Sequence, residues 1–93
     1  MLSLDPDDKI ILDGILQTFP HPVYAYGSRV KGTHKKFSDL DLCIMDNLRE
    51  LELFNLQTAL EESDLSIKVD IRLWNHMQPS FRNLIQNDLI QLK

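Results

Sequence analysis

Three aspartates are spaced so that their carboxylates could act together. Asp39 and Asp41 lie two residues apart in an apolar stretch, where a strand would point both side chains to one face, about 6–7 Å apart. Asp70 has the matching polar-face position in a later apolar stretch. Clustered carboxylates repel one another unless a cation neutralises them, and oxygen ligands with room for water suit Mg²⁺. On neighbouring strands, the three could hold two ions about 3.5–4 Å apart. The alternative is the ordinary polar face of a one-sided sheet.

A Gly-Ser pair precedes these aspartates. Gly27 ends a short predicted strand and Ser28 opens a predicted turn of helix. Backbone N–H groups and a hydroxyl at the positive end of a helix suit phosphate oxygens, although a plain turn with a serine cap is the alternative. Four basic residues then precede the aspartates, namely Arg29, Lys31, Lys35 and Lys36. The sequence therefore predicts one polyanion site, while a solvated loop would explain the charge alone equally well.

Hydrophobic spacing predicts the elements that position these residues. Asp5 and Pro6 are typical of a helix start, and Gly32 of the end of a short helical turn. The predicted elements are a helix over 6–19, a strand over 23–26, a helical turn over 28–31, a strand over 39–45, a helix over 48–62, a strand over 67–73 and a helix that opens at Pro79. This order predicts one mixed α/β domain over residues 1–93.

The predicted core follows from the same spacing. In the second strand, Leu40, Leu42 and Ile44 point to one face, and Cys43 is expected to be buried. In the last helix, the residues expected to face inward are Phe81, Leu84, Ile85 and Leu89. Trp74 could stack on a base, but packing is the stronger expectation.

Composition limits the class of protein. The chain has 93 residues and a net charge of −4, which favours a single small domain and disfavours direct nucleic-acid binding. No apolar run is long enough for a membrane span, and the acidic N-terminus does not resemble a secretory signal. One cysteine excludes an internal disulfide and fits a reducing compartment, so we expect a cytoplasmic protein. The histidines have no zinc-ligand spacing.

The combination of motifs is more specific than any of its parts. A strand, Gly27-Ser28, ten residues and then Asp39-Leu40-Asp41 stand in the stretch YGSRVKGTHKKFSDLDLCI, and the third acid stands in IKVDIRLW. Four fixed residues at this spacing arise by chance on the order of once in a thousand chains of this length. Over roughly residues 22–74 the sequence resembles the minimal nucleotidyltransferases of the DNA polymerase beta superfamily. The resemblance implies their fold, a small mixed sheet packed against helices.

The resemblance also implies roles for individual residues. Gly27 and Ser28 would hold the β- and γ-phosphates of a nucleoside triphosphate, with ATP as the expected donor. Asp39, Asp41 and Asp70 would bind two Mg²⁺ ions, and Asp70 could accept the proton of the attacking hydroxyl. Arg29 and Lys31, with Lys35 or Lys36, are candidates for binding the triphosphate.

Larger members of the superfamily carry a second domain for the acceptor, and this chain ends soon after the Asp70 strand. We therefore expect a partner chain in a hetero-oligomer. The resemblance implies an antitoxin that transfers AMP from ATP to a tyrosine of a HEPN-domain RNase toxin. Two alternatives remain open at this point. One is a catalytically silent binding module that covers its partner, and the other is the catalytic subunit of a two-chain small-molecule nucleotidyltransferase.

Overall fold

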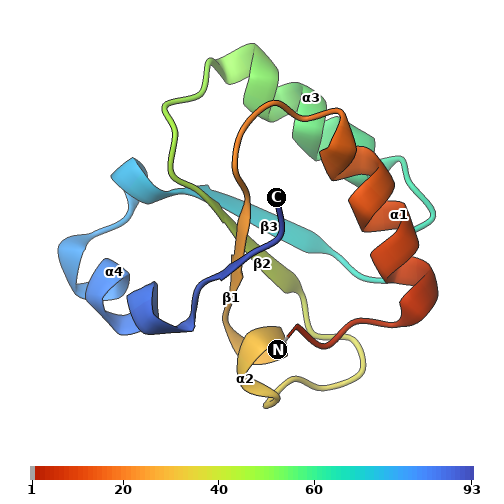
Figure 1. The fold of residues 1–93 in the computed structure, drawn as a ribbon, viewed down its shortest axis with the longest axis horizontal. Helices are drawn as coiled ribbons and strands as arrows, with labels where there is room; N and C mark the ends of the chain where they lie inside the picture. Colours follow the sequence, from red (N-terminus) through yellow and green to blue (C-terminus); the bar gives the residue numbers. More distant parts are fainter. Residues whose placement is uncertain (1) are drawn as a thin grey trace.

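A four-stranded mixed sheet in the order β3-β2-β1-β4 forms the centre of the molecule (Figure 1). The structure is a computed structural model that describes residues 2–93, and its strands are β1 (Tyr24–Tyr26), β2 (Leu40–Ile44), β3 (Val69–Leu73) and β4 (Ile90–Gln91). β1 runs antiparallel to both β2 and β4, whereas β2 and β3 are parallel. A parallel pair needs a crossover connection, which α3 (Glu50–Glu61) supplies here.

The other helices begin and end close to the predicted positions. They are α1 (Pro6–Gln17), α2 (Ser28–Lys31) and α4 (Pro79–Ile85), with 3₁₀ turns η1 (Trp74–His76) and η2 (Gln86–Asp88). Asp5 caps α1 as expected, because its Oδ1 accepts a hydrogen bond from the backbone N–H of Asp7 at 3.0 Å. Among residues 2–93, no helix has the length and apolar character needed to cross a bilayer.

Two apolar clusters lie on opposite faces of the sheet. On one face, α1 and α3 cover the main core, which includes Leu12, Leu16, Leu40, Leu42, Ile44, Leu56 and Leu60. On the other face, α4 and the residues before it cover a smaller cluster that includes Tyr26, Cys43, Met77 and Ile85. Figure 1 shows α1 and α3 together, with α4 on the other side of the strands. The polar face expected from the sequence is therefore only partly open.

Burial in this smaller cluster confirms one expectation and corrects another. Cys43 is fully buried, and burial raises the pKa of its thiol to about 11. Ile85 and Phe81 pack inward as predicted, and Trp74 packs beside them. Leu84 does not, because it is 67% exposed. The reason is that α4 is short and packs through Phe81 and Ile85, four residues apart, which leaves Leu84 on the open side of the helix.

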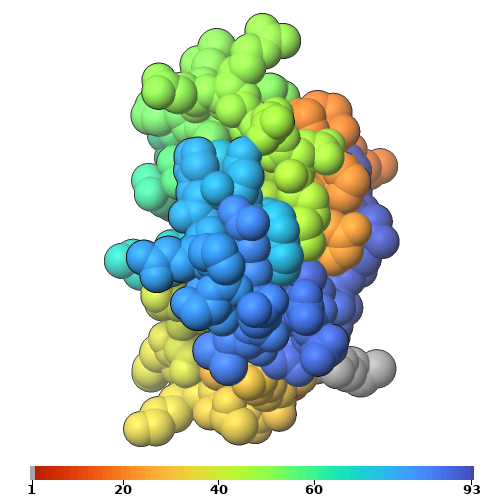
Figure 2. Space-filling model, turned by 90° about the vertical axis from the view of Figure 1, so that its left-hand side faces the viewer, coloured from red at the N-terminus to blue at the C-terminus, as the bar shows by residue number. Residues whose placement is uncertain are grey.

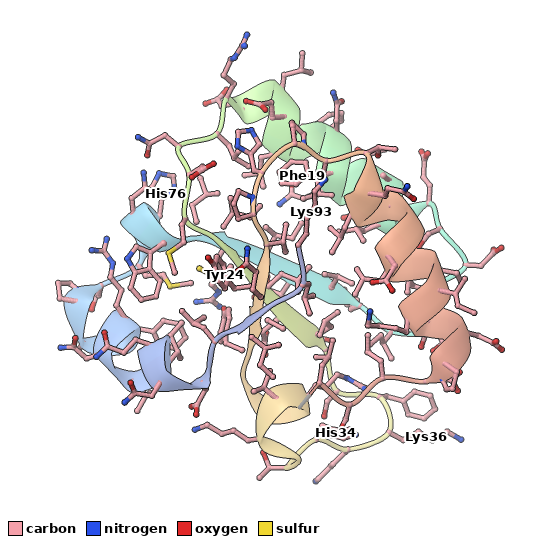
Figure 3. The ribbon with its side chains drawn as sticks, viewed as in Figure 1. Phe19, Tyr24, His34, Lys36, His76 and Lys93 are labelled. Carbon is pink, nitrogen blue, oxygen red and sulfur yellow. The ribbon has the colours of Figure 1, made fainter. Side chains whose placement is uncertain are left out.

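The C-terminal segment forms a strand that the sequence analysis missed. Ile90 pairs with Ala25 of β1, so β4 closes this edge of the sheet. Lys93 then reaches α1, where its Nζ donates to the carbonyls of Leu16 at 2.7 Å and Gln17 at 3.2 Å, and to that of Phe19. Lys93 and Phe19 lie close together in Figure 3. A cation at this position stabilises the negative end of a helix that has no basic residue in its last turn.

His21, whose ring centroid lies 5.2 Å from that of Phe19, joins the segment before β1 to the loop after β2 and to α3. Its Nδ1 lies 3.0 Å from Oδ2 of Asp46, and its Nε2 lies 2.7 Å from Oε2 of Glu52 in the first turn of α3. Glu52 also accepts a hydrogen bond from the backbone N–H of Arg49. The hydrogen bonds to Asp46 and then Glu52 raise the pKa of His21. The protonated imidazole therefore ties β1 to the start of α3.

We expect the His21→Gln variant to lose pH-dependent stability. Because the pKa of His21 is higher in the folded state, its stabilisation is complete below the unfolded value of about 6.5 and is lost as the pH rises through the folded value. Urea unfolding near pH 5 and near pH 9 should show a smaller difference in the variant than in the wild type. The exposed His76→Gln change should keep the wild-type difference, and equal differences in all three proteins would contradict this role.

Candidate active site

The parallel pairing of β2 and β3 places Asp41 beside Asp70 as register partners. On its other side, Asp41 pairs with Tyr26 of β1. Asp39 directly precedes β2 and is exposed. The two strands are thus neighbours, which is the condition for the carboxylates to converge.

Electrostatics around Asp41 are those of a like-charged cluster. Burial raises the pKa of its carboxyl, and the nearby carboxylates of Asp70 and Asp39 raise it further, while Arg72 opposes them. The ionised site is therefore unfavourable, and a bound cation would relieve that cost.

The carboxylates of Asp39, Asp41 and Asp70 are the kind of ligand that Mg²⁺ prefers, and Asp41 and Asp70 are register partners. Their side-chain conformations do not yet bring the oxygens together around one point. Oδ2 of Asp70 accepts a hydrogen bond from Nε of Arg72 at 3.1 Å, and both side chains are about half exposed. Within the described residues 2–93, no three Asp, Glu, His or Cys side chains are assembled around a common point. Binding a cation would require the exposed carboxylates of Asp39 and Asp70 to turn toward Asp41.

Gly27 brings the Gly-Ser turn directly against Asp41. It precedes α2 with φ 85° and ψ −156°, a conformation that is essentially restricted to glycine. A Cβ at this position would lie 2.5 Å from Oδ2 of Asp41, so only a hydrogen atom fits between the turn and the carboxylate. The turn expected to bind phosphate and the aspartate expected to bind metal therefore share one small space.

This space opens into a cavity of about 400 Å³. Its walls are Tyr26, Gly27, Ser28, Lys31, Thr33, Asp41, Arg72, Phe81, Leu84 and Ile85. Figure 2 views the molecule from the α4 side, where the blue C-terminal residues lie above the yellow residues that follow β1. Of the predicted site residues, the cavity brings together Gly27, Ser28, Lys31 and Asp41. Asp39 and Asp70 lie beside it, and the exposed Lys35 and Lys36 lie outside its lining.

Lys31 differs from Arg29, although both are basic residues of α2. Nζ of Lys31 lies 3.4 Å from Oδ2 of Asp88, and the lysine side chain is half exposed, which leaves its charge free to approach an anion. Arg29 is only 5% exposed. Its guanidinium donates to the carbonyls of Ser38 at 3.0 Å, Ser3 at 3.1 Å and Lys36 at 3.1 Å. The expectation that Arg29 binds the triphosphate is therefore wrong, because its donors hold the loop and the N-terminal segment together.

We expect Arg29→Met to lower the free energy of unfolding by about 3–5 kcal/mol, because it leaves three carbonyls without their donor. Lys31→Met should change stability by only about 0.5 kcal/mol, since the side chain is half exposed, and should instead weaken nucleotide binding. Urea unfolding and calorimetric titration of both variants separate the two roles. A stable Arg29→Met protein with impaired nucleotide binding would contradict the assignment.

Three further residues of the cavity were missed by the sequence analysis. The ring of Tyr26 packs edge to face on Phe81 with centroids 5.9 Å apart, and the guanidinium of Arg72 lies 5.7 Å from the Phe81 centroid. Burial, followed by the charge of Asp41, raises the pKa of Tyr26 to about 12, so this phenol stays neutral. Arg72 could have been found from its position two residues after Asp70, on the same strand face.

Comparison with known proteins identifies the family. Residues 12–92 match the family described as "Polymerase beta, Nucleotidyltransferase". The chain belongs to this family. It is a nucleotidyltransferase of class EC 2.7.7, similar to "Probable protein adenylyltransferase MntA" of Haemophilus influenzae (strain ATCC 51907 / DSM 11121 / KW20 / Rd). The two are 39% identical over 89 residues, which cover 91% of this chain and 78% of the relative.

Solved structures show the same polymerase beta-like fold. A protein in a structure described as a toxin-antitoxin with AMP-PNP superposes with a TM-score of 0.69 and 21% identity, covering 91% of this chain and 72% of its own. A chain of a toxin-antitoxin MntA-HpeT mutant (Y104A) superposes with a TM-score of 0.65 and 24% identity, covering 98% of this chain and 73% of its own. A protein from Shewanella oneidensis superposes with a TM-score of 0.62 and 18% identity, covering 97% of this chain and 72% of its own. At these identities the likeness concerns the fold.

Proposed function

We propose that this nucleotidyltransferase is an antitoxin that, with Mg²⁺, transfers AMP from ATP to a tyrosine hydroxyl of a HEPN-domain RNase toxin. The observation that carries the proposal is the close approach of Gly27 to Asp41 in one cavity. A phosphate-binding turn against a carboxylate cluster suits a metal-bound triphosphate, because both the phosphates and the carboxylates need the same cation.

The residues around the cavity have separate roles in the proposed reaction. The turn at Gly27 and Ser28 binds the β- and γ-phosphates, and Lys31 adds a positive charge beside them. Asp39, Asp41 and Asp70 would hold Mg²⁺, which would neutralise the phosphate charge that builds up in the reaction. The acceptor oxygen attacks the α-phosphorus, the bond to the β-phosphate oxygen breaks, and pyrophosphate leaves. Asp70 accepts the proton of the acceptor hydroxyl.

Two observations support a protein acceptor in a toxin partner. The Haemophilus influenzae relative, at 39% identity, is named a probable protein adenylyltransferase. Two of the similar structures are described as toxin-antitoxin complexes, one of them with the ATP analogue AMP-PNP. Leu84 adds a feature of this chain itself, because it exposes an apolar side chain at the mouth of the cavity, where an aromatic acceptor could rest.

Intact-mass analysis of the HEPN-domain partner tests the proposal. After incubation with ATP and Mg²⁺, the partner should gain the mass of AMP less one water, and peptide mapping should place it on a tyrosine. Asp41→Asn should leave the partner unmodified, whereas Asp13→Asn, an exposed change on α1, should modify it as the wild type does. An unmodified partner in a tight complex would instead indicate a silent binding module, and AMP on a small molecule would indicate the two-chain enzyme.

A further inference from the structure

β3 is an edge strand whose outer side is open. It is the last strand on its side of the sheet and pairs only with β2. The backbone N–H of Leu40 donates to the carbonyl of Lys68, and Leu40 is in register with Val69. In a parallel ladder alternate residues of a strand direct their backbone N–H and C=O groups toward the partner strand. Because Lys68 faces β2, the backbone groups of Val69, Ile71 and Leu73 point away from β2. Among the described residues 2–93, no hydrogen bond reaches these outward groups from another segment.

From this edge we infer that a second copy of the chain pairs with β3 in antiparallel fashion, across a two-fold axis at Ile71. With the axis at this position, Ile71 of one copy lies opposite Ile71 of the other. The two residues form a hydrogen-bonded pair, because the N–H and C=O of each point outward. Val69 then lies opposite Leu73 of the second copy, and Leu73 lies opposite its Val69. Each of the three pairs exchanges two backbone hydrogen bonds, which gives six in total. The inference concerns self-association and goes beyond the proposed transfer reaction.

The sequence of β3 is complementary to itself in this register. Within one chain, Nε of Arg72 donates to Oδ2 of Asp70 at 3.1 Å. In the metal-free dimer, Asp70 also lies opposite Arg72 of the second copy, and Arg72 opposite its Asp70. Both are non-hydrogen-bonded pairs, in which side chains approach most closely. On the other face, Val69 meets Leu73, so apolar side chains face apolar ones. Any other antiparallel register that keeps the hydrogen-bonding pattern loses both of these ion pairs, so charge alone selects the axis at Ile71.

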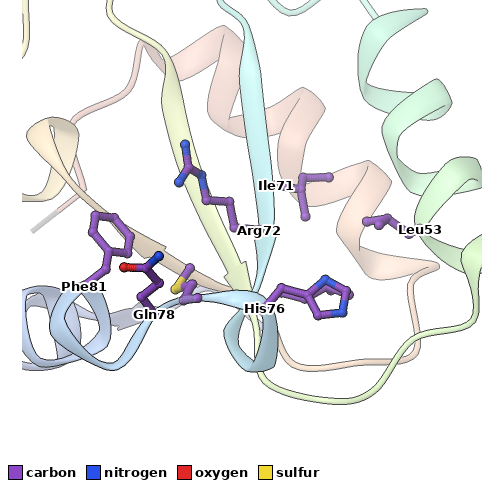
Figure 4. Close-up of a pocket in the computed structure, with 8 residues that line it drawn as sticks. Leu53, Ile71, Arg72, His76, Gln78 and Phe81 are labelled. Atoms are coloured by element: carbon purple, nitrogen blue, oxygen red, sulfur yellow. The ribbon is translucent and has the colours of Figure 1, made fainter.

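The surroundings of the edge provide apolar surface for a second copy to cover. A cavity of about 520 Å³ runs beside the strand, with Leu53 of α3 and Ile71 of β3 among its walls. Figure 4 shows Ile71 directed toward Leu53, while Arg72 points to the opposite side, toward Phe81. An exposed edge flanked by apolar side chains is the kind of surface that proteins normally cover.

A charge-exchange experiment tests the inference by mass in solution, without any assay of activity. By sedimentation velocity without Mg²⁺, the wild type should have twice its monomer mass of 10.8 kDa at high micromolar concentration. Asp70→Arg and Arg72→Asp each turn both ion pairs into like-charged pairs, so each should raise the dissociation constant about tenfold or more. An equimolar mixture of the two variants should form a heterodimer, since every cross-strand pair is then opposite in charge.

The controls separate the edge from general effects of charge. Asp64→Arg makes the same change of charge at an exposed position outside β3 and should leave the dimer intact. The double variant Asp70→Arg/Arg72→Asp should dimerise again, because it restores both cross-strand ion pairs. Heterodimer formation in the mixture shows that both single variants fold. A wild type that stays monomeric, single variants that dimerise as the wild type does, or a mixture that forms no heterodimer would each overturn the inference.

Discussion

Replacing Asp41 by asparagine should lower the rate of nucleotidyl transfer by about a thousandfold or more. Asp41 is the carboxylate that reaches into the cavity, beside Gly27 and in register with Asp70. Losing its charge removes a proposed ligand of the cation, and charge stabilisation by a metal ion is worth several kcal/mol, at about 1.4 kcal/mol for each factor of ten.

The same substitution should leave the protein folded and raise its melting temperature at neutral pH. The pKa of Asp41 is raised in the folded state by burial and by Asp70 and Asp39, so the folded protein holds the proton more tightly than the unfolded chain. The ionised carboxylate therefore costs stability as the pH rises through the folded pKa, and asparagine avoids that cost. The increase should appear without Mg²⁺ and should shrink when the wild type is measured with Mg²⁺.

Measuring activity and melting temperature together distinguishes a metal-binding role of Asp41 from a purely structural one. Asp13→Asn on α1 serves as the control, because it also removes one negative charge but lies in an exposed ion pair with Lys9. It should change neither quantity appreciably. An Asp41→Asn protein that is active, or one that is less stable than the wild type in the absence of metal, would contradict the assignment.

Gly27→Ala should be the most damaging alanine substitution among the three glycines. The added Cβ would lie 2.5 Å from Oδ2 of Asp41, and the backbone at Gly27 has a conformation that alanine rarely adopts. Strain alone should cost about 1–3 kcal/mol, and displacing the carboxylate should add to it. Transfer activity should fall steeply even in the folded fraction, because the methyl group pushes Asp41 out of the space that it shares with the phosphate-binding turn.

Gly32→Ala is the matched control. Gly32 also has a positive φ, 78°, but nothing lies within 4 Å of the place where its Cβ would be. This variant should lose about 1 kcal/mol from left-handed strain and keep its activity. Urea unfolding and activity assays of both variants separate backbone strain from the contact with Asp41. Equal losses of activity in the two would show that the close approach at Gly27 has no catalytic consequence.

Residues close together in sequence made most of the fold predictable. Alternating apolar residues located β2 and β3 within two residues, and the Asp5-Pro6 signal located the start of α1. The Gly27-Ser28 turn and the Asp39–Asp41 spacing are likewise local patterns, so the sequence identified the parts of the candidate site and the family resemblance that the comparisons confirm.

Contacts between distant segments account for what was missed. β4 has two residues and exists only because β1 pairs with it, so no local pattern distinguishes it from the end of a helix. Arg29 is recognisable as a structural residue only once Ser3 and Ser38 have been brought beside it. Leu84 has the spacing of a core residue, but α4 ends before a second inward turn can bury it.

Calorimetric titration with AMP-PNP is the most direct test of a metal-dependent nucleotide site in this cavity, because binding can be measured without turnover. We expect the wild type to bind AMP-PNP in the presence of Mg²⁺, chelation of the metal to abolish binding, and Asp41→Asn to bind at least about tenfold more weakly. The HEPN-domain partner should be included in a parallel titration. Binding that is indifferent to both Mg²⁺ and Asp41, or no binding with or without the partner, would contradict the claim that this cavity is a metal-dependent nucleotide site.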